Sequence, residues 1–248
     1  MKKVMLVTGA GRGIGAQIAL LAGSRGYAVA VNYQNSRDAA LDVVRQIEAS
    51  GGTAIALQAN AGNSAEVTRL FGEVDAQLGT LDVLVNNAGI LASYRVDALD
   101  EDNLRKTFEA NVFSAFYCSR EAVRRMSTAH GGRGGVIINV SSVAARMAAV
   151  AGGTVYSASK GAIDSFNLSL AKEVGLEGIR VNAVRPGLID TEIHAPRGGL
   201  DKIREMAKTG VPMGRSGSPA EVAEAVLWLA SDAASYVHGS VLDVAGGR

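Results

Sequence analysis

The sequence predicts an α/β fold: a doubly wound parallel sheet of the Rossmann type, in one domain over residues 1–248. Two observations support this prediction. Short apolar runs rich in β-branched residues alternate with helix-length amphipathic runs along most of the chain. A glycine-rich turn joins the first apolar run to the first helical run, and no linker or internal repeat divides the chain. We therefore expect seven strands in the order 3-2-1-4-5-6-7.

Composition and charge exclude several classes of protein. The 48% hydrophobic content is enough for a large core, and the net charge of +1 gives no reason to expect a nucleic-acid partner. The single cysteine, Cys118, cannot form an internal disulfide and fits a reducing compartment. The apolar run at the N-terminus is too short for a signal peptide, and no run is long enough to cross a membrane. We expect a cytoplasmic protein without a membrane partner.

The first strand, Val4–Thr8, leads into the glycine-rich turn Thr8–Gly15 and a helix through about Leu21. Gly9 permits the tight turn, Gly13 lets the backbone approach a pyrophosphate, and Gly15 lets the helix pack on the strand. The spacing differs from the common G-x-G-x-x-G, yet it meets the same physical requirements. A glycine cluster alone is also typical of a flexible turn, but its place between strand and helix favours a nucleotide site.

The second strand, Tyr27–Tyr33, bears on the choice of cofactor. An NAD site places a carboxylate at the end of this strand to bind the ribose 2′-hydroxyl, and none stands there. Arg12 and Arg37 could instead bind a 2′-phosphate through charge-assisted hydrogen bonds. NADP(H) is therefore favoured over NAD(H). The alternative for Arg37 is that it faces solvent at the start of a helix.

The remaining elements continue the alternation. Ser64 is expected to cap a helix, and Ser218 to open a capping box. The charged stretch Arg120–Arg125 is expected to form a solvated helix face or an edge between subunits. Residues 188–217 interrupt the pattern and are interpreted as a substrate loop or lid. The further strands are expected at Thr53–Gln58, Leu81–Val85, Val136–Val140, Ile179–Val184 and Val241–Val244. The further helices are expected at Asp38–Ser50, from Ser64 to about Leu78, as one or two runs over Asp100–Met126, as a modest helix at about Asp201–Lys208, and from Ser218 to about Leu229.

Tyr156 and Lys160 are spaced so that they share one face of the helical run that contains them. A phenol titrates near pH 10, and a nearby positive charge favours its anion, which suits Tyr156 to donate and accept protons near neutral pH. The pair is weak evidence alone, because a solvated lysine beside a half-buried tyrosine has the same spacing. Ser142 follows the fifth strand at the sheet edge where ligands gather, so it can reach the same point.

Together these motifs resemble the short-chain dehydrogenase/reductase family, in its single-domain branch of about 250 residues, the length of this chain. Within the family the chain is similar to acyl-carrier-protein ketoreductases, to glucose dehydrogenases and, around Asn32–Ser36, to NADPH-dependent naphthol reductases. The matching residues are Thr8–Gly15, Asn86–Gly89, Asn111, Ser141-Ser142, Tyr156-x-x-x-Lys160, Arg185–Gly187 and Asp243–Gly247.

The resemblance implies a role for each site residue. Tyr156 would be the general acid in reduction and the general base in oxidation, with Lys160 lowering its pKa and binding the nicotinamide ribose. Ser142 would bind the substrate oxygen, and Asn111 would hold a water that links Lys160 to solvent. At Asn60 the family usually has aspartate, so adenine binding would be slightly weaker. The cofactor would be lined by Gly9, Arg12, Gly13, Ile14, Gly15, Asn32, Tyr33, Ser36, Asn60, Ala61, Asn87, Ala88, Gly89, Tyr156, Lys160, Pro186, Gly187, Ile189 and Thr191.

The function expected is hydride transfer between NADP(H) and a carbonyl or secondary alcohol, without a metal. The alternative is a cofactor-binding sensor without turnover, which would not need all four catalytic residues. A sugar-nucleotide epimerase would resemble a longer chain with a second lobe. We expect the substrate to be a small molecule held by residues 91–94, 146–150 and 188–217. His194 is a candidate for contact with it, although a lone histidine in a loop more often faces solvent. We expect a homotetramer, as is usual in the family.

Overall fold

The computed structural model describes residues 2–91, 93–147 and 152–248. Within them, seven strands form one parallel sheet in the order β3-β2-β1-β4-β5-β6-β7, which confirms the predicted fold class and strand order. The strands are β1 (Val4–Val7), β2 (Ala28–Tyr33), β3 (Thr53–Gln58), β4 (Leu81–Asn86), β5 (Gly135–Val140), β6 (Ile179–Pro186) and β7 (Val241–Val244).

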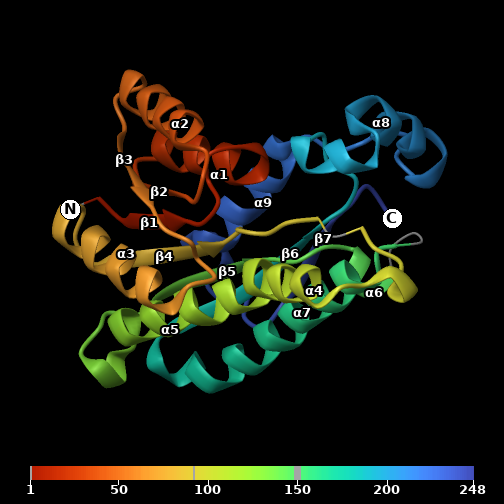
Figure 1. Ribbon diagram of the computed structural model, residues 1–248. Coiled ribbons are helices and arrows are strands. Elements are labelled where there is room, and N and C mark those ends of the chain that lie inside the picture. The colour runs from red at the N-terminus through yellow and green to blue at the C-terminus, as the bar shows by residue number, and fades with distance from the viewer. Residues whose placement is uncertain (1, 92, 148–151) are drawn as a thin grey trace.

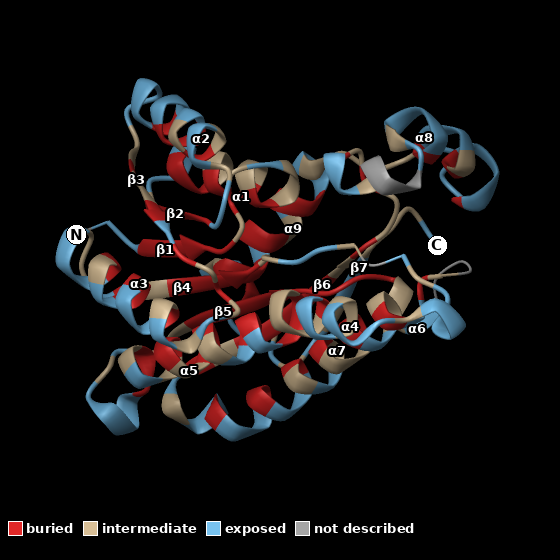
Figure 2. Cartoon of the chain, in the orientation of Figure 1, coloured by how far each residue is buried: buried red, intermediate tan, exposed pale blue. Residues whose placement is uncertain are grey.

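Helices cover both faces of the sheet (Figure 1). One layer contains α1 (Gly13–Ser24), α2 (Arg37–Ala49) and α9 (Pro219–Ala230), and the other contains α3 (Ser64–Gln77), α4 (Glu101–Phe108), α5 (Ser114–Met126) and α7 (Thr154–Val174). The strand β1 shows why two cores form. Met5 and Val7 point into the core under α1 and α9, whereas Val4 and Leu6 point into the core under α3 and α5, as expected when successive side chains alternate between faces. Figure 2 shows the buried residues concentrated along the strands and the inner helix faces.

Several local predictions need correction. Asn63, not Ser64, caps α3, because its side chain accepts hydrogen bonds from the backbone N–H groups of Ala65 and Glu66. The stretch Arg120–Arg125 is solvated only in part: Arg124 is exposed, but Glu121 is not. Glu121 is 3% exposed and its carboxylate pairs with Arg120, Arg124 and Arg125. The capping box at Ser218 is confirmed, as is the burial of Cys118.

The sequence predicted one or two helical runs over Asp100–Met126, and the structure has two, α4 and α5. A π-helical turn, η2 (Glu109–Phe113), separates α4 from α5. Short 3-10 helices occur at η1 (Val96–Ala98), η3 (Thr128–His130), η4 (Gly175–Glu177), η5 (Glu192–Arg197) and η6 (Asp232–Ala234), and α6 (Ala144–Met147) is a single turn after β5. No helix in the described ranges is long and apolar enough to span a bilayer.

Residues 188–217 are more helical than the sequence indicates, since they contain η5 and α8 (Gly199–Gly210). Ile203 and Ala207 are the buried residues of α8, and a buried face of two residues leaves only a weak pattern in the sequence. The segment leaves and rejoins the domain at one place. Asp190 donates its backbone N–H to Gly217 O at 2.9 Å, and Gly217 donates to Leu188 O at 2.9 Å. The insertion is thus held at its base and stands over the carboxyl ends of the strands (Figure 1).

Candidate functional site

The site lies where the strand order reverses. Strand β1 is hydrogen-bonded to β2 on one side and to β4 on the other, and the turns that follow β1 and β4 meet there. Thr8 Oγ1 accepts the backbone N–H groups of Asn87 and Ala88, each at 3.0 Å. Asn87 Nδ2 in return donates to Thr8 O at 2.9 Å and to Gly9 O at 3.1 Å. These bonds hold the glycine-rich turn and the Asn86–Gly89 turn as one rigid unit.

The glycines of the first turn are required by its geometry. Gly9 and Gly13 have φ values of +63° and +56°, which favour glycine. At Gly15 the constraint is space, because a Cβ atom there would lie 2.5 Å from Gly9 O and would also overlap the Asn87 side chain. No side chain caps α1 at Arg12, so the backbone N–H groups of its first turn are available to an anion.

A cleft of about 300 Å³ begins at this turn and has the features of a dinucleotide site. It shares Ile14, Asn87, Gly89, Thr191 and other residues with a second cavity of about 400 Å³, so the two form one continuous groove. The groove brings together all the residues predicted to hold the cofactor. The first cavity is lined by Gly9, Arg12, Gly13, Ile14, Gly15, Asn32, Tyr33, Ser36, Asn60, Ala61, Asn87, Ala88, Gly89 and Thr191, and the second by Tyr156, Lys160, Pro186, Gly187 and Ile189, among others.

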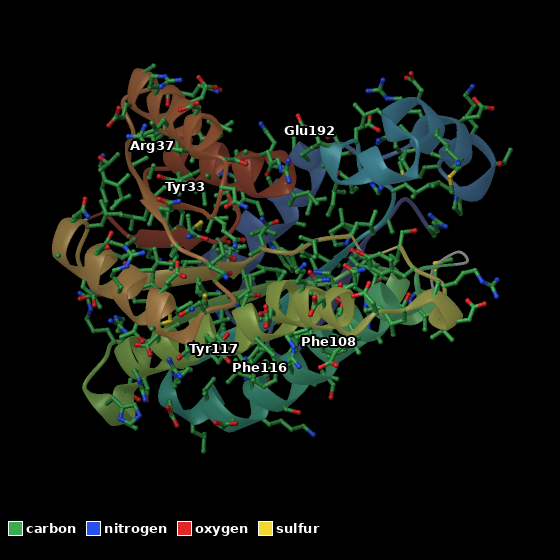
Figure 3. The ribbon with its side chains drawn as sticks, viewed as in Figure 1. Tyr33, Arg37, Phe108, Phe116, Tyr117 and Glu192 are labelled. Carbon is green, nitrogen blue, oxygen red and sulfur yellow. The ribbon has the colours of Figure 1, made fainter. Side chains whose placement is uncertain are left out.

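The two arginines proposed to read a 2′-phosphate differ in position. Arg12 lines the cleft, and its Nη1 lies 3.9 Å from a carboxylate oxygen of Glu192 on η5. Arg37 is exposed at the start of α2 and is not among the residues that line the cleft (Figure 3). The structure therefore brings Arg12 to the site and leaves Arg37 in solvent, the alternative that the sequence left open.

Two asparagines of the cleft make internal bonds. Asn32 is buried, and its side chain accepts the Gly9 N–H at 3.3 Å and donates to Ala59 O at 3.1 Å, so it ties the glycine-rich turn to the end of β3. Asn60 Oδ1 accepts the Gly62 N–H at 2.9 Å. One lone pair of that oxygen remains for a ligand, which fits the predicted contact with adenine.

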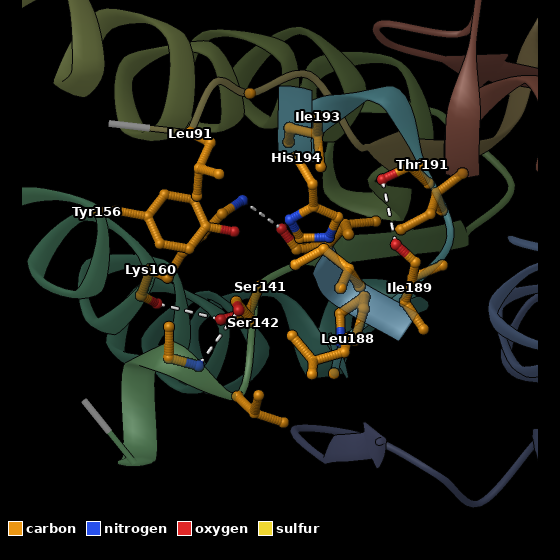
Figure 4. A pocket seen from close by; sticks show the side chains of 18 of the residues that line it. Leu91, Ser141, Ser142, Tyr156, Lys160, Leu188, Ile189, Thr191, Ile193 and His194 are labelled. Carbon is orange, nitrogen blue, oxygen red and sulfur yellow. Dashed lines mark hydrogen bonds between the residues drawn. The ribbon is translucent and has the colours of Figure 1, made fainter. Parts of the chain in front are cut away.

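The second cavity is lined by three of the four predicted catalytic residues, Ser142, Tyr156 and Lys160, whereas Asn111 is not among its lining residues (Figure 4). Tyr156, Lys160, Ser141 and Ser142 line it together with apolar side chains from the 188–217 segment. Of the predicted substrate-binding residues, Leu91, Ser93, Met147, Leu188, Ile193 and His194 line this cavity, while Ala92 and residues 148–150 lie outside the described parts of the chain. From the same 188–217 segment, α8 also contributes Lys202, Ile203 and Met206.

Lys160 is 5% exposed. Its Nζ donates to Val140 O at 2.8 Å, at the end of β5 just before the two serines. Burial lowers the pKa of Lys160 to about 8, although the nearby Asp164 carboxylate acts to raise it. The side chain is therefore still protonated near neutral pH, close to Tyr156: its nitrogen lies 5.9 Å from the centre of the phenol ring. Ser142 Oγ accepts the Ala144 N–H at 3.2 Å, which orients its hydroxyl at the pocket wall.

Asn111 lies in the π-helical turn and bridges two parts of the site. Its Oδ1 accepts the Ile90 N–H at 2.7 Å, and its Nδ2 donates to Ile90 O and to Ser159 Oγ, each at 3.0 Å. Ser159 in turn donates to Tyr156 O at 2.7 Å. The side chain thus joins the turn after β4 to the helix that carries Tyr156. Its predicted role in a water relay stays a prediction.

The sequence reasoning missed some contributors to the pocket. Val140, Val143 and Ile90 line it, and so does Arg248 from the far end of the chain. Val140 and Val143 flank the two predicted serines, so adjacency to a known site residue was a usable signal. The same signal applies to Ile90, which lies between Gly89 and Leu91, whereas only the tertiary fold brings Arg248 to the cavity.

Comparisons with known proteins agree with this geometry. Residues 9–248 match a family model described as "Enoyl-(Acyl carrier protein) reductase". The chain is 46% identical over 246 residues to the uncharacterized oxidoreductase YgfF of Escherichia coli, with 99% of each chain covered. The chain belongs to the short-chain dehydrogenase/reductase family. It is an NAD(P)-dependent oxidoreductase of that family.

Two further short-chain dehydrogenase/reductase relatives indicate cofactor and chemistry. Versicolorin reductase stcU of Emericella nidulans is 42% identical over 255 residues, covering 99% of this chain and 95% of the relative. A solved short-chain dehydrogenase from Burkholderia cenocepacia in complex with NADP has a TM-score of 0.88 and 33% identity, covering 99% of this chain and 97% of the other. These similarities confirm the family resemblance and its single-domain fold.

Proposed function

We propose that this protein is an NADPH-preferring carbonyl reductase that uses Tyr156 as its general acid and base. The observation that carries the proposal is the convergence of Tyr156, Lys160 and Ser142 on one cavity that continues into the dinucleotide groove. The preference for NADPH is supported by Arg12 in the cleft and by the absence of a carboxylate where β2 ends, at Tyr33 and the three residues after it.

The residues divide the reaction between them. When bound, NADPH supplies a hydride to the carbonyl carbon of the substrate. Ser142 donates a hydrogen bond to the carbonyl oxygen as negative charge develops on it. Tyr156 transfers its phenolic proton to that oxygen, which leaves an alcohol and a phenolate. The ammonium of Lys160 stabilises the phenolate until Tyr156 takes a proton back from water.

The walls of the cavity favour an apolar substrate. Ile90, Leu91, Met147, Ile193 and Met206 surround the catalytic groups. Among the described lining residues no side chain is a carboxylate, whereas Lys202 and Arg248 contribute cationic groups. We propose that the substrate is a bulky apolar or aromatic ketone, and that it tolerates an anionic substituent better than a cationic one.

A non-catalytic sensor remains the competing function, and one variant separates the two. Wild-type protein should oxidise NADPH in the presence of aromatic ketones, and Tyr156→Phe should lower kcat by about 10²–10⁴-fold while NADPH still binds. Binding is followed by quenching of protein fluorescence. An enoyl thioester belongs in the same panel, because the family model carries an enoyl reductase description. Equal turnover by Tyr156→Phe would reject Tyr156 as the acid, and NADPH binding without turnover of any substrate would favour the sensor.

We also propose a cytoplasmic homotetramer. Three large apolar side chains are exposed here: Phe113 at the end of η2 (41%), Phe116 of α5 (47%) and Leu168 of α7 (49%). The rings of Phe116 and Phe166 pack with centroids 4.1 Å apart, so the apolar patch spans α5 and α7. Figure 3 shows the position of Phe116. Burying such a patch against a second copy stabilises an assembly. Light scattering of the purified protein tests this, and a monomer at micromolar concentration would contradict it.

A further inference from the structure

A buried lysine stays charged only if its surroundings stabilise the ammonium form, because burial disfavours charge. Lys160 is almost fully buried, and removal from water lowers its pKa to about 8, with the Asp164 carboxylate opposing that change. If Lys160 loses its proton in the working pH range, it can no longer stabilise a phenolate on Tyr156. Whatever holds the charge on Lys160 therefore belongs to the functional site, although it touches neither substrate nor cofactor.

We propose that Asp164 is a positioning residue that keeps Lys160 in its charged form, and that Arg185 and Asp243 hold the Asp164 carboxylate for this task. The proposal rests on the catalytic role proposed above for Tyr156 and Lys160. Asp164 lies one helical turn beyond Lys160 on α7, so the two side chains share a face of the helix. No motif identified in the sequence includes Asp164.

The carboxylate of Asp164 has an asymmetric environment. Its Oδ2 accepts a hydrogen bond from Arg185 Nε at 2.9 Å, and Arg185 Nη2 lies 2.8 Å from the same oxygen as an ion-pair contact. Its Oδ1 is buried and has no hydrogen-bond partner in the described structure. A buried, unpartnered carboxylate oxygen costs free energy unless a charge acts on it. The described residues show no direct ion pair between Asp164 and Lys160, so the two charges act on each other through space, and this attraction opposes the fall in the pKa of Lys160.

Arg185 is held from its other side. Its Nη1 lies 3.4 Å from Asp243 Oδ1, and Asp243 Oδ2 accepts from Arg146 Nη2 at 2.9 Å. Arg146 also donates to the main-chain oxygen of Arg248 at 2.9 Å. Positive and negative groups thus alternate from Lys160 to Arg146, through four elements: α7, β6, β7 and α6. The chain of charges ends on the short helix that follows Ser142, so it joins the two walls of the catalytic pocket.

Other charged groups occur on the elements packed against α7. They are Glu101, Asp102, Arg105, Lys106 and Glu109 on α4 and η2, Arg146 on α6, Arg180 and Arg185 on β6, Glu177 on η4 and, on α7 itself, Lys172 and Glu173. Tyr156 and Asp164 are the titratable groups nearest to Lys160 in sequence, each four residues away. Of the charges on described residues, that of Asp164 is the one that shifts the pKa of Lys160. The bland alternative is that Asp164 and Arg185 only brace a helix against a strand.

The experiment compares titration of Lys160 in wild type, Asp164→Asn and Asp75→Asn, each free of cofactor. Asp75 is a matched control, because it pairs with Arg125 Nε at 2.7 Å on another helix, away from the pocket. Protein labelled with ¹⁵N and ¹³C at lysine is followed by NMR, with the Lys160 signal assigned from Lys160→Met. In Asp164→Asn the midpoint should fall by about one pH unit, and in Asp75→Asn it should not move.

A kinetic measurement complements the titration. In the direction of alcohol oxidation, kcat should fall at a lower pH in Asp164→Asn than in wild type, because the neutral lysine appears sooner. Arg185→Lys keeps the charge but loses the planar guanidinium that contacts Asp164 Oδ2 through both Nε and Nη2. It should lower the Lys160 midpoint by less than Asp164→Asn does, and it is measured in place of Asp164→Asn if that variant does not fold. An unchanged Lys160 midpoint in a folded variant would overturn the proposal. The titration of Lys160 does not require turnover, so the two proposals are tested separately. Full activity of Tyr156→Phe would reject the proposed function, whereas an unchanged Lys160 midpoint would reject the role of Asp164.

Discussion

The Nζ atom of Lys160 donates a hydrogen bond to the carbonyl oxygen of Val140, at a distance of 2.8 Å. This bond fastens the middle of the α7 face to the end of β5, directly before Ser141 and Ser142. A second bond, from Ser141 Oγ to Lys160 O at 3.1 Å, fastens the same two elements through the backbone. The helix with the proton donor and the strand with the substrate-binding hydroxyl therefore cannot slide past each other, and the catalytic geometry is built before any ligand arrives.

The first prediction concerns the stability cost of this lysine. Its folded pKa of about 8 lies below the ordinary value of 10.5, so the unfolded chain binds more protons between these two values. Below pH 8 the whole free-energy cost of the buried charge is present, and this cost disappears as the pH rises from 8 toward 10.5. The pKa shift corresponds to a cost of about 3 kcal/mol for burying the charge of Lys160. A variant without the lysine avoids this cost but loses the hydrogen bond to Val140 O, which is worth roughly 1 kcal/mol.

Lys160→Met should accordingly raise the free energy of unfolding by about 1–2 kcal/mol near pH 7 in the absence of cofactor, with a smaller gain above pH 8. Urea unfolding at several pH values measures both quantities. A gain that grew with pH would show that the folded pKa is raised, contrary to the structure.

The second prediction tests the turn after β1. Gly15→Ala places a Cβ atom 2.5 Å from Gly9 O and against the Asn87 side chain, so one of the two turns must move. We expect a loss of about 1–3 kcal/mol in stability and a large increase in the Kd for NADPH. Gly72→Ala in α3 is the control. It has open space around its Cβ position, so it should keep NADPH binding unchanged and stabilise the helix slightly. Normal NADPH binding by Gly15→Ala would show that the turn is not the phosphate site.

The third prediction concerns the choice of cofactor. Arg12→Ala should raise KM for NADPH by about 10–100-fold and leave KM for NADH nearly unchanged, since a charged hydrogen bond to the 2′-phosphate is worth roughly 1.5–3 kcal/mol. Glu192→Gln removes the carboxylate 3.9 Å from Arg12 and should lower KM for NADPH modestly. Arg37→Ala, on the solvent side of α2, should change neither value. Equal effects of Arg12→Ala on both cofactors would assign this residue another role.

The sequence predicted the strand order because that order depends on local patterns. It also singled out Ser142, Tyr156 and Lys160, which the structure brings to one cavity, because few other roles require these residue types at that spacing. It failed where tertiary packing decides. The pairing of Glu121 with three arginines cannot be read from a charged helical run, since the same run would suit a solvated face. The π-helical turn at Asn111 is equally hidden: its cause is the set of bonds to Ile90 and Ser159, which are distant in sequence. The amphipathic face of α8 is short and broken by polar residues, so the lid resembled an irregular loop.

The last prediction concerns the charge of the substrate. Three aromatic ketones with one skeleton and a neutral, carboxylate or ammonium substituent far from the carbonyl should differ in kcat/KM. Lys202 and Arg248 lie at the cavity, neither side chain forms an ion pair within the described structure, and no carboxylate side chain balances them there. The carboxylate ketone should be reduced at least as well as the neutral one, and the ammonium ketone should be about 5–10-fold worse. Lys202→Gln should narrow the difference, and so should high salt, because screening weakens exposed charges. If the ammonium ketone had the highest kcat/KM of the three, the substituent would not lie beside Lys202 and Arg248, and the prediction would be wrong.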